Sequence, residues 1–405
     1  MGIDIDQLAR TLDARLAESD TALAAQFPGA RPGRQPVHTV YVPADRYRAD
    51  LCPSWGAAAV EAIDAHDVLF AELVGDDDVV ERVRRKLATE PIEDLRIDFE
   101  DGYGAKPDDT EDADVVAAAT ALADSRQIDA AAAFTGIRIK SFEAPTRARG
   151  LRTLVMFLTT FTEAGGDLEN VVTTLPKVTS VEQVEAMVYV CEQLEHDLGA
   201  DGLRFEIQVE TPQSILGPDG GALVARMIHA ADGRCSALHY GTYDYSAFCG
   251  IAAEYQSMAH PVADHAKLVM QAAAAGTGVR LSDGSTNVIP VGDRVREGWQ
   301  LHLGLVRRSL ERGYYQGWDL HPAQLPSRHA ATFAFFRAGL DPATTRLRNY
   351  VTQTSSAILD EPATARALAD YLLRALHCGA ATAAELADAT ELTAEHLAEL
   401  ARPGR

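Results

Sequence analysis

Charged side chains recur in this sequence directly after short apolar runs, in positions where several of them could act together. The nine positions are Glu100, Asp101, Arg138, Lys140, Lys177, Glu210, Asp244, Asp283 and His321. Carboxylates can hold a divalent cation or transfer a proton, and a guanidinium can bind a carboxylate or stabilise an oxyanion. We interpret the set as one site, and the alternative for any single member is a solvated loop charge.

Glu210 and Asp244 are the pair that points to a metal. Each ends an apolar run, and the two runs follow one another along the chain. Two carboxylates, completed by water and substrate oxygens, are a usual way of holding Mg²⁺, because this ion gives up its water reluctantly. The alternative is a helix N-cap, since an acidic residue after a strand often starts the next helix. The pattern leaves both interpretations open.

The elements that would position these side chains are strands alternating with helices. Eight strand candidates lie at residues 38–43, 95–101, 134–141, 171–178, 204–211, 235–244, 278–288 and 314–322. Helical patterns separate them, for example at 181–199 and 296–313. Strands joined by crossover helices pair in parallel, and eight such units predict an α/β fold of the TIM (β/α)8 barrel type, whose active site lies at the carboxyl ends of the strands. An open doubly wound sheet is the alternative, but no G-x-G-x-x-G or Walker loop follows the first strand.

The flanks of the predicted barrel have a different character. Residues 1–37 form one amphipathic helix pattern and a Pro/Gly-rich linker, residues 38–337 hold the strand–helix alternation, and residues 338–405 contain helical patterns only. We therefore predict an N-terminal helix, a TIM-barrel catalytic domain and a C-terminal helical extension with these boundaries. The extension could serve as a lid or as a contact between subunits.

Composition excludes several classes of partner. The chain has 405 residues with 37 basic and 59 acidic side chains, which give a formal net charge of −22. Nucleic acids and anionic membrane surfaces need a basic footprint, so neither is an expected partner. The five cysteines are scattered, the N-terminus is no secretory signal, and no apolar stretch is long enough for a membrane helix. These features predict a soluble, cytoplasmic protein. No H-E-x-x-H motif occurs, which excludes a zincin, and no G-x-S-x-G motif occurs, so the main signature of an α/β hydrolase is missing.

An ordered series of motifs resembles one known superfamily. The motifs are D-F-E-D-G-Y-G at 98–104, G-I-R-I-K at 136–140, L-P-K-V at 175–178, V-E-T at 209–211, G-T-Y-D-Y at 241–245 and G-W-D-L-H-P-A-Q at 317–324. In this order they resemble the HpcH/HpaI aldolase and citrate lyase β-subunit-like superfamily. The usual acidic motif there is D-L-E-D-A/S-V, so Phe99, Gly102 and Tyr103 mark a divergent branch with its own substrate.

The resemblance implies a TIM barrel and assigns roles to five of the residues. Glu210 and Asp244 match the carboxylates that bind Mg²⁺, with Mn²⁺ as the alternative ion. Arg138 matches the arginine that contacts the carboxylate or carbonyl of the substrate. Glu100 and Asp101 match the acidic pair that organises metal-bound water or substrate.

Three further assignments complete the predicted site. Lys177 matches a lysine beside the pocket, acting as a catalytic residue or as a charge partner for the acids. Lys140 is predicted to bind substrate together with Arg138. Asp360 falls where the related CoA lyases carry an aspartate on a C-terminal segment that closes over the active site, and an N-cap for the helix starting near Pro362 is its alternative. The family also implies a homo-oligomer, commonly trimeric or hexameric.

The predicted activity is that of a Mg²⁺-dependent carbon–carbon lyase or aldolase. It would cleave or form a small oxo- or hydroxy-carboxylic acid through a metal-stabilised enolate. One alternative is a lyase or synthase of the malyl-CoA or citramalyl-CoA type, which acts on a CoA thioester and needs a phosphate-binding patch such as Arg147, Arg149 and Arg152. The other is a catalytically silent barrel that binds metabolites.

Overall fold

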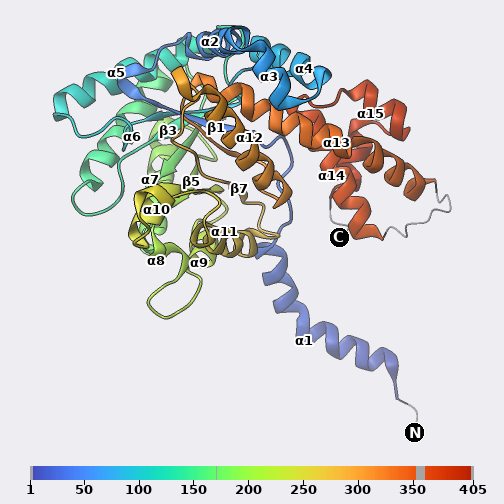
Figure 1. The fold of residues 1–405 in the computed structure, drawn as a ribbon. Helices are drawn as coiled ribbons and strands as arrows, with labels where there is room; N and C mark the ends of the chain where they lie inside the picture. The colour runs from blue at the N-terminus through green and yellow to red at the C-terminus, as the bar shows by residue number, and fades with distance from the viewer. Residues whose placement is uncertain (1–2, 170, 353–360, 403–405) are drawn as a thin grey trace.

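The computed structural model describes residues 3–169, 171–352 and 361–402. At its centre, eight parallel strands curve into a nearly closed barrel with helices around it (Figure 1). The strand order is β7-β6-β5-β4-β3-β2-β1-β8, and a bridge between Ser282 and Gln316 brings the two edges of the sheet together. The TIM-barrel prediction is confirmed.

Each of the eight predicted apolar runs contains one strand. The strands are β1 His38–Pro43, β2 Asp94–Asp98, β3 Phe134–Arg138, β4 Val171–Leu175, β5 Arg204–Val209, β6 Cys235–Tyr240, β7 Arg280–Ser282 and β8 Gly317–Asp319. The seventh is much shorter than the run at 278–288 suggests. The side chain of Asp283 accepts a hydrogen bond from the amide of Gly284 at 2.8 Å, and this local turn competes with further strand pairing.

Crossover helices cover the outside of the barrel, and further helices lie at both ends of the chain. Their bounds are α1 Ile5–Gln26, α2 Leu51–Ala65, α3 Asp67–Val74, α4 Asp77–Thr89, α5 Asp108–Ser125, α6 Arg147–Glu163, α7 Val181–Leu198, α8 Pro212–Ile215, α9 Leu223–Ala230, α10 Thr242–Phe248, α11 Pro261–Ala274, α12 Val295–Glu311, α13 Leu325–Val351, α14 Pro362–Cys378, α15 Ala383–Thr390 and α16 Ala394–Leu400. Helices α7 and α12 confirm the patterns at 181–199 and 296–313. A capping box of Ser180 and Gln183 starts α7, and left-handed Gly199 ends it.

The inside of the barrel holds a buried polar network. Arg96 of β2 donates to both carboxylate oxygens of Glu206 of β5, at 2.9 and 2.8 Å, and also to Asp94. Glu206 further accepts from Thr174 at 2.5 Å and lies 3.1 Å from the His239 ring. Although burial opposes it, Arg96 holds the pKa of Glu206 well below its ordinary value. Glu206 is therefore a carboxylate at neutral pH.

The terminal helices differ in how they attach to the barrel. Helix α1 has no buried residue and stands away from the rest of the molecule (Figure 1). Helix α13 begins beside the barrel and runs unbroken past the predicted boundary at 337/338, and α14 packs against it. The division at residues 37 and 337 stays a prediction.

Two simpler expectations concern cysteines and membranes. All five cysteines are free thiols, so the chain has no disulfide framework. Across the described ranges, every helix is too short or too polar to span a bilayer.

Removing one partner of the central ion pair should destabilise the barrel strongly. In Arg96→Ala, Glu206 and Asp94 stay buried without their counter-charge, so the free energy of unfolding should fall by about 3–5 kcal/mol. Urea denaturation followed by circular dichroism measures this. Exposed Arg307, which pairs with Glu311, is the control, and Arg307→Ala should change the free energy of unfolding by less than about 0.5 kcal/mol. Equal stability of the two variants would contradict the role of Arg96.

The attachment of α15 should depend on pH through Glu385. This carboxylate accepts from Arg82 and Arg337, each at 2.9 Å. Burial opposes the shift, but the amide and hydroxyl of Thr382 and the Arg82 guanidinium lower the pKa of Glu385 to about 2. A lowered pKa gives stability that is present above the unfolded value of about 4.3 and is lost as pH falls towards 2.

The comparison of wild type with Glu385→Gln tests this, because glutamine keeps the acceptor for Thr382 and removes the charge. At pH 7 the free energy of unfolding, measured by urea denaturation, should be higher for the wild type by about 1 kcal/mol, a small difference because Glu385 is partly exposed. This difference between the two proteins should shrink towards pH 3. Exposed Glu163 supplies the control, Glu163→Gln, which should show no such trend. A difference that stays constant with pH would argue against the ion pairs.

Candidate active site

The carboxyl ends of five consecutive strands bring six of the predicted residues to one end of the barrel. Glu100 and Asp101 follow β2, Arg138 ends β3, Lys177 follows β4 and Glu210 follows β5; Asp244 lies in the first turn of α10, directly after β6. Because parallel strands all point the same way, their carboxyl ends share one rim. The structure thus brings together residues that lie up to 144 positions apart in the sequence.

Lys177 lies at the centre of the carboxylates. Its Nζ is 2.5 Å from Glu100 Oε1, 2.8 Å from Asp101 Oδ2 and 3.1 Å from Asp244 Oδ2. Its backbone amide donates to Glu210 Oε1 at 2.7 Å. Burial alone would lower the pKa of Lys177, but Glu210 and Glu100 hold it well above its ordinary value. These acids therefore favour the protonated, positively charged form of Lys177.

The backbone of Lys177 is in an uncommon conformation. Its φ is +51°, in the left-handed region that side chains other than glycine rarely adopt. Such conformations cost of order 1–3 kcal/mol and persist where the surroundings impose them. Here the hydrogen bond that the backbone amide donates to Glu210 and the three ion pairs of Nζ fix the residue. The strain lies within the cluster, as is common at functional sites.

Arg138 is held in place by Asp98, the last residue of β2. Its Nε donates to Asp98 Oδ1 at 2.7 Å and its Nη2 to Asp98 Oδ2 at 2.6 Å. The third nitrogen, Nη1, has only long contacts, 3.4 Å to Gln208 Oε1 and 3.4 Å to Glu100 Oε2. The guanidinium also lies over the ring of Tyr41, 4.9 Å from its centroid. Nη1 is thus the nitrogen left for a ligand.

Glu210 is almost wholly buried. One oxygen accepts from the Lys177 amide and the other from the side-chain amide of Gln208. A Cβ at position 241 would lie 2.5 Å from the Cβ of Glu210, so only glycine fits there. Burial raises the pKa of Glu210 to about 8, against the opposing effect of Lys177. The positive charges of Lys177 and Arg138 do not offset the effect of burial on the pKa of this carboxyl group.

The other acids of the cluster have distinct electrostatic situations. Burial raises the pKa of Glu100. Burial also favours a higher pKa for Asp101, but the hydrogen bond that Lys177 donates outweighs burial and lowers the pKa of Asp101. Asp244 Oδ2 is buried and receives no hydrogen bond, although Lys177 Nζ lies near it. The ion pair with Lys177, at 3.1 Å, therefore balances this buried oxygen without a hydrogen bond.

These donors fit a divalent cation held by two carboxylates. Among the described residues, no group of three or more His, Cys, Asp or Glu side chains is arranged to bind a metal by itself. Mg²⁺ does not need such a group, because it keeps several waters and uses one or two carboxylates. Glu210 is a buried carboxyl group whose pKa a nearby cation would lower, and Asp244 has an oxygen that accepts no hydrogen bond, so both match that requirement.

The N-cap alternative for these two residues is wrong. The N-cap of α8 is Thr211 and that of α10 is Gly241. Neither Glu210 nor Asp244 occupies the N-cap position, and Asp244 is instead an acidic residue in the first turn of α10.

The structure does not bring the remaining candidates into this cluster. Lys140 Nζ donates to Glu111 at 2.7 Å and to the Phe99 carbonyl at 2.7 Å. Asp283 accepts from Lys267 at 2.8 Å and from Ser309 at 2.6 Å.

His321 and Asp360 are the last two candidates. The ring of His321 accepts from the Ala323 amide at 3.1 Å and caps a short helix. Asp360 lies outside the described residues, and the N-cap of α14 is Glu361. The role of Asp360 over the site stays a prediction.

Two residues of the site, Asp98 and Gln208, were not singled out by the sequence pattern. Both lie in strands where charged or polar residues alternate with apolar ones, D-L-R-I-D in β2 and F-E-I-Q-V-E across β5. That alternation is the usable signal, since alternate residues of a barrel strand point inward. Gly102 has a related role: its amide donates to Asp98 at 2.9 Å, and a Cβ would lie 2.6 Å from the same oxygen.

The arginines proposed as a phosphate patch are already paired. Arg149 and Arg152 both bind Asp112, at 2.7 and 2.5 Å, and Arg149 also lies 3.1 Å from Glu111. Arg147 donates to the Phe142 carbonyl at 2.9 Å. The charges of Arg149 and Arg152 are thus paired within the fold, whereas the bond of Arg147 is to a neutral carbonyl oxygen.

Solved structures with a similar fold include two kinds of enzyme. Haloferax volcanii malate synthase in its magnesium/glyoxylate complex superposes with a TM-score of 0.51 at 13% identity, covering 92% of this chain and 99% of that one. CitE from Mycobacterium tuberculosis, in complex with magnesium, acetoacetate and coenzyme A, gives a TM-score of 0.50 at 19% identity, covering 84% and 97%. The fold resemblance to citrate lyase β-subunit-like barrels is confirmed.

Sequence comparison identifies the family. No curated protein sequence matches the chain. One family model, however, matches residues 16–404, which includes the barrel and nearly all of the terminal helices. The chain therefore belongs to the family described as Domain of unknown function (DUF6986).

Proposed function

We propose that the protein is a Mg²⁺-dependent enzyme that forms or cleaves a carbon–carbon bond beside a carbonyl group. Its substrate is a small oxo- or hydroxy-carboxylic acid, and the reaction is of the aldolase or lyase type. The observation that carries the proposal is the convergence of Lys177, Arg138 and the surrounding carboxylates at the carboxyl end of the barrel.

Glu210 and Asp244 would hold the metal ion, with Mn²⁺ as the alternative to Mg²⁺. When bound, the ion supplies a Lewis acid and a template for a carbonyl and a neighbouring carboxylate. The burial of the Glu210 carboxyl group and the Asp244 oxygen that accepts no hydrogen bond support this assignment. Magnesium named in the structures of the CitE and malate synthase barrels agrees with it.

Arg138 would bind the substrate through Nη1. Its other nitrogens are fixed by Asp98, so the guanidinium cannot turn away from the site. A fixed donor aimed at a developing negative oxygen stabilises an enolate without reorganisation at the moment of reaction. Lysine has a single ammonium on a flexible stem and cannot hold Asp98 and a substrate in the same geometry.

Lys177 and the acidic pair would organise the site around the substrate. The ammonium keeps Asp101 ionised and fixes the position of Glu100. Glu100 is buried, its pKa is raised, and one of its oxygens lies 3.4 Å from Arg138 Nη1. It is therefore the carboxyl group best placed to move a proton at an atom held by Arg138.

A CoA-thioester lyase or synthase is the second candidate. The presence of coenzyme A and acetoacetate in the CitE structure supports it. The pairing of Arg149 and Arg152 with Asp112 weighs against the phosphate patch at that place. A metabolite-binding barrel without catalysis is the third. The trimeric or hexameric state and the cytoplasmic location stay predictions.

Proton exchange from the methyl group of a nucleophile is the direct test of enolate formation. With Mg²⁺ in D₂O, the methyl signal of pyruvate in the proton NMR spectrum should disappear over time, and Glu210→Ala should slow this by at least about 100-fold. Loss of the acetyl-CoA methyl signal instead would favour the CoA lyases. Glu163→Ala, an exposed carboxylate away from the site, should exchange like the wild type. Exchange of neither compound would favour the silent barrel.

Arg138→Lys should not restore the function of the guanidinium. We expect the exchange rate to fall by on the order of 100-fold in Arg138→Lys, and no less in Arg138→Ala, because a fixed oxyanion donor is lost. Thermal unfolding of each variant shows whether the fold is intact. A wild-type exchange rate in the lysine variant would remove Arg138 from the mechanism.

A further inference from the structure

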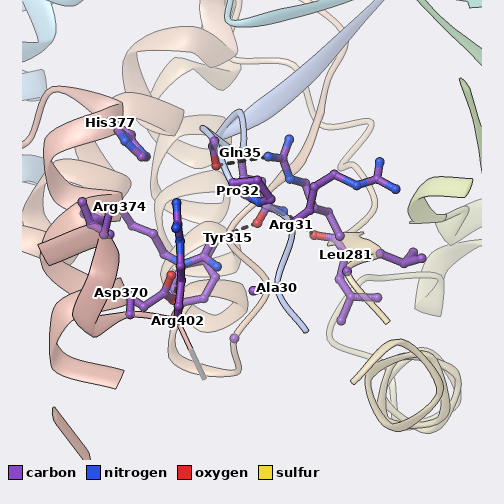
Figure 2. Close-up of a pocket in the computed structure, with 18 of the residues that line it drawn as sticks. Ala30, Arg31, Pro32, Gln35, Leu281, Tyr315, Asp370, Arg374, His377 and Arg402 are labelled. Atoms are coloured by element: carbon purple, nitrogen blue, oxygen red, sulfur yellow. Dashed lines mark hydrogen bonds and ion pairs between the residues drawn. The ribbon is translucent and has the colours of Figure 1, made fainter. Parts of the chain in front are cut away.

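A second cavity lies at the opposite end of the barrel from the candidate active site. It has a volume of about 520 Å³ and is enclosed by the linker before β1, the start of β7 and the C-terminal helices α14 and α16. Figure 2 shows Asp370, Arg374 and His377 on one side and Arg31 and Pro32 of the linker facing them. Strands begin at this end of the barrel, so the residues of the candidate active site contribute nothing to it.

The cavity is lined by four arginines, Arg31, Arg280, Arg374 and Arg402. Arg280 donates to the Gly33 carbonyl at 3.2 Å, and Arg31 to the carbonyls of Gly233 and Cys235 at 3.2 and 3.5 Å. These hydrogen bonds go to neutral carbonyl oxygens, so among the described residues the positive charges of Arg31 and Arg280 have no carboxylate partner. The Arg402 guanidinium has no partner among the described residues.

The acidic residues nearby do not balance this charge. Asp370 accepts from Arg374 at 2.8 Å, and Glu395, the other carboxylate lining the cavity, is exposed. Asp94 lies behind the cavity wall, but it is bonded to Arg96 and Thr39 inside the barrel. Four cationic side chains therefore face two carboxylates, of which one is already paired.

The electrostatics of Arg280 reflect that imbalance. Burial, together with the charges of Arg31 and Arg374, lowers its pKa to about 10. Burial also lowers the pKa of His377, and nearby arginines add to this effect. Neighbouring arginines therefore disfavour the cationic form of Arg280, although Arg374 itself is paired with Asp370. In a chain with a net charge of −22, such a cluster is a local exception.

We propose that this cavity binds a small organic polyanion, a metabolite carrying phosphate groups or several carboxylates. Guanidinium groups recognise both through paired hydrogen bonds. The volume exceeds what a single phosphate needs and falls within the range of metabolite pockets. Leu281, Leu373 and the ring of Tyr315 give it apolar walls, and Arg374 lies 4.2 Å from the centroid of that ring.

A ligand here would join parts of the chain that are distant in sequence. Arg31 belongs to the linker, Arg280 to β7, Arg374 to α14 and Arg402 follows α16. Anion binding relieves the repulsion among these charges and ties the C-terminal helices to the barrel. The proposal concerns a site separate from the catalytic one, and it does not depend on which reaction the enzyme performs.

Isothermal titration calorimetry with two probes, inorganic pyrophosphate and citrate, tests the proposal in 150 mM NaCl. The full-length wild type should bind at least one probe saturably with a dissociation constant below about 1 mM. Arg280→Gln, which keeps a donor for the Gly33 carbonyl, should weaken that binding at least about tenfold. Arg307→Gln removes one exposed positive charge elsewhere and should bind like the wild type. Preference between the probes distinguishes a phosphorylated ligand from a polycarboxylate.

Arg402→Gln repeats the test at an exposed position, in case Arg280→Gln does not fold. It should also weaken binding while its thermal unfolding without ligand stays unchanged. The proposal is overturned if the wild type binds neither probe, or if the Arg402 variant and any folded Arg280 variant bind as tightly as the Arg307 control. Glu210→Ala should bind the probes like the wild type, so a failure of the catalytic proposal leaves this result readable.

Discussion

The buried pairing of Arg96 with Glu206 is the interaction on which the rest of the molecule depends. A charge in the interior is costly unless it is paired and fully hydrogen-bonded, so each member fixes the position of the other. The pair joins β2 to β5, two strands that are not neighbours in the sheet. The barrel is therefore held across its interior by directed bonds as well as around its circumference by strand pairing.

The candidate site repeats the same construction one layer higher. Asp98 and Glu210 stand two and four residues beyond Arg96 and Glu206 in their strands or just after them, and they face the same interior. Arg138 and Lys177 supply the positive charges there, as Arg96 does below. The outer layer differs in that Arg138 Nη1 has long contacts of 3.4 Å, and Asp244 Oδ2 forms an ion pair with Lys177 but accepts no hydrogen bond. A ligand could bind at these two atoms, and this distinguishes the candidate site from a structural network.

Sequence reasoning reached the architecture because alternation of strands with helices has few solutions. It also placed six charged residues on one rim, since strand order determines which ends meet. It could not choose partners: Lys140 lies two residues after Arg138, the last residue of β3, yet it bonds Glu111 on α5. Nor could it find the second cavity, because the arginines at 31, 280, 374 and 402 carry no local pattern and meet only through packing of the termini.

Helix α13 connects the barrel to the C-terminal helices. It has 27 residues, about 40 Å at 1.5 Å per residue. Near its start Arg328 bonds both oxygens of Asp319 in β8, and further along Arg337 binds Glu385 of α15. A truncation at 337 would cut through the middle of this rod and expose the face on which α14 packs. A chain that ended at 337 would therefore lose the contacts through which α13 links the barrel to α14 and α15.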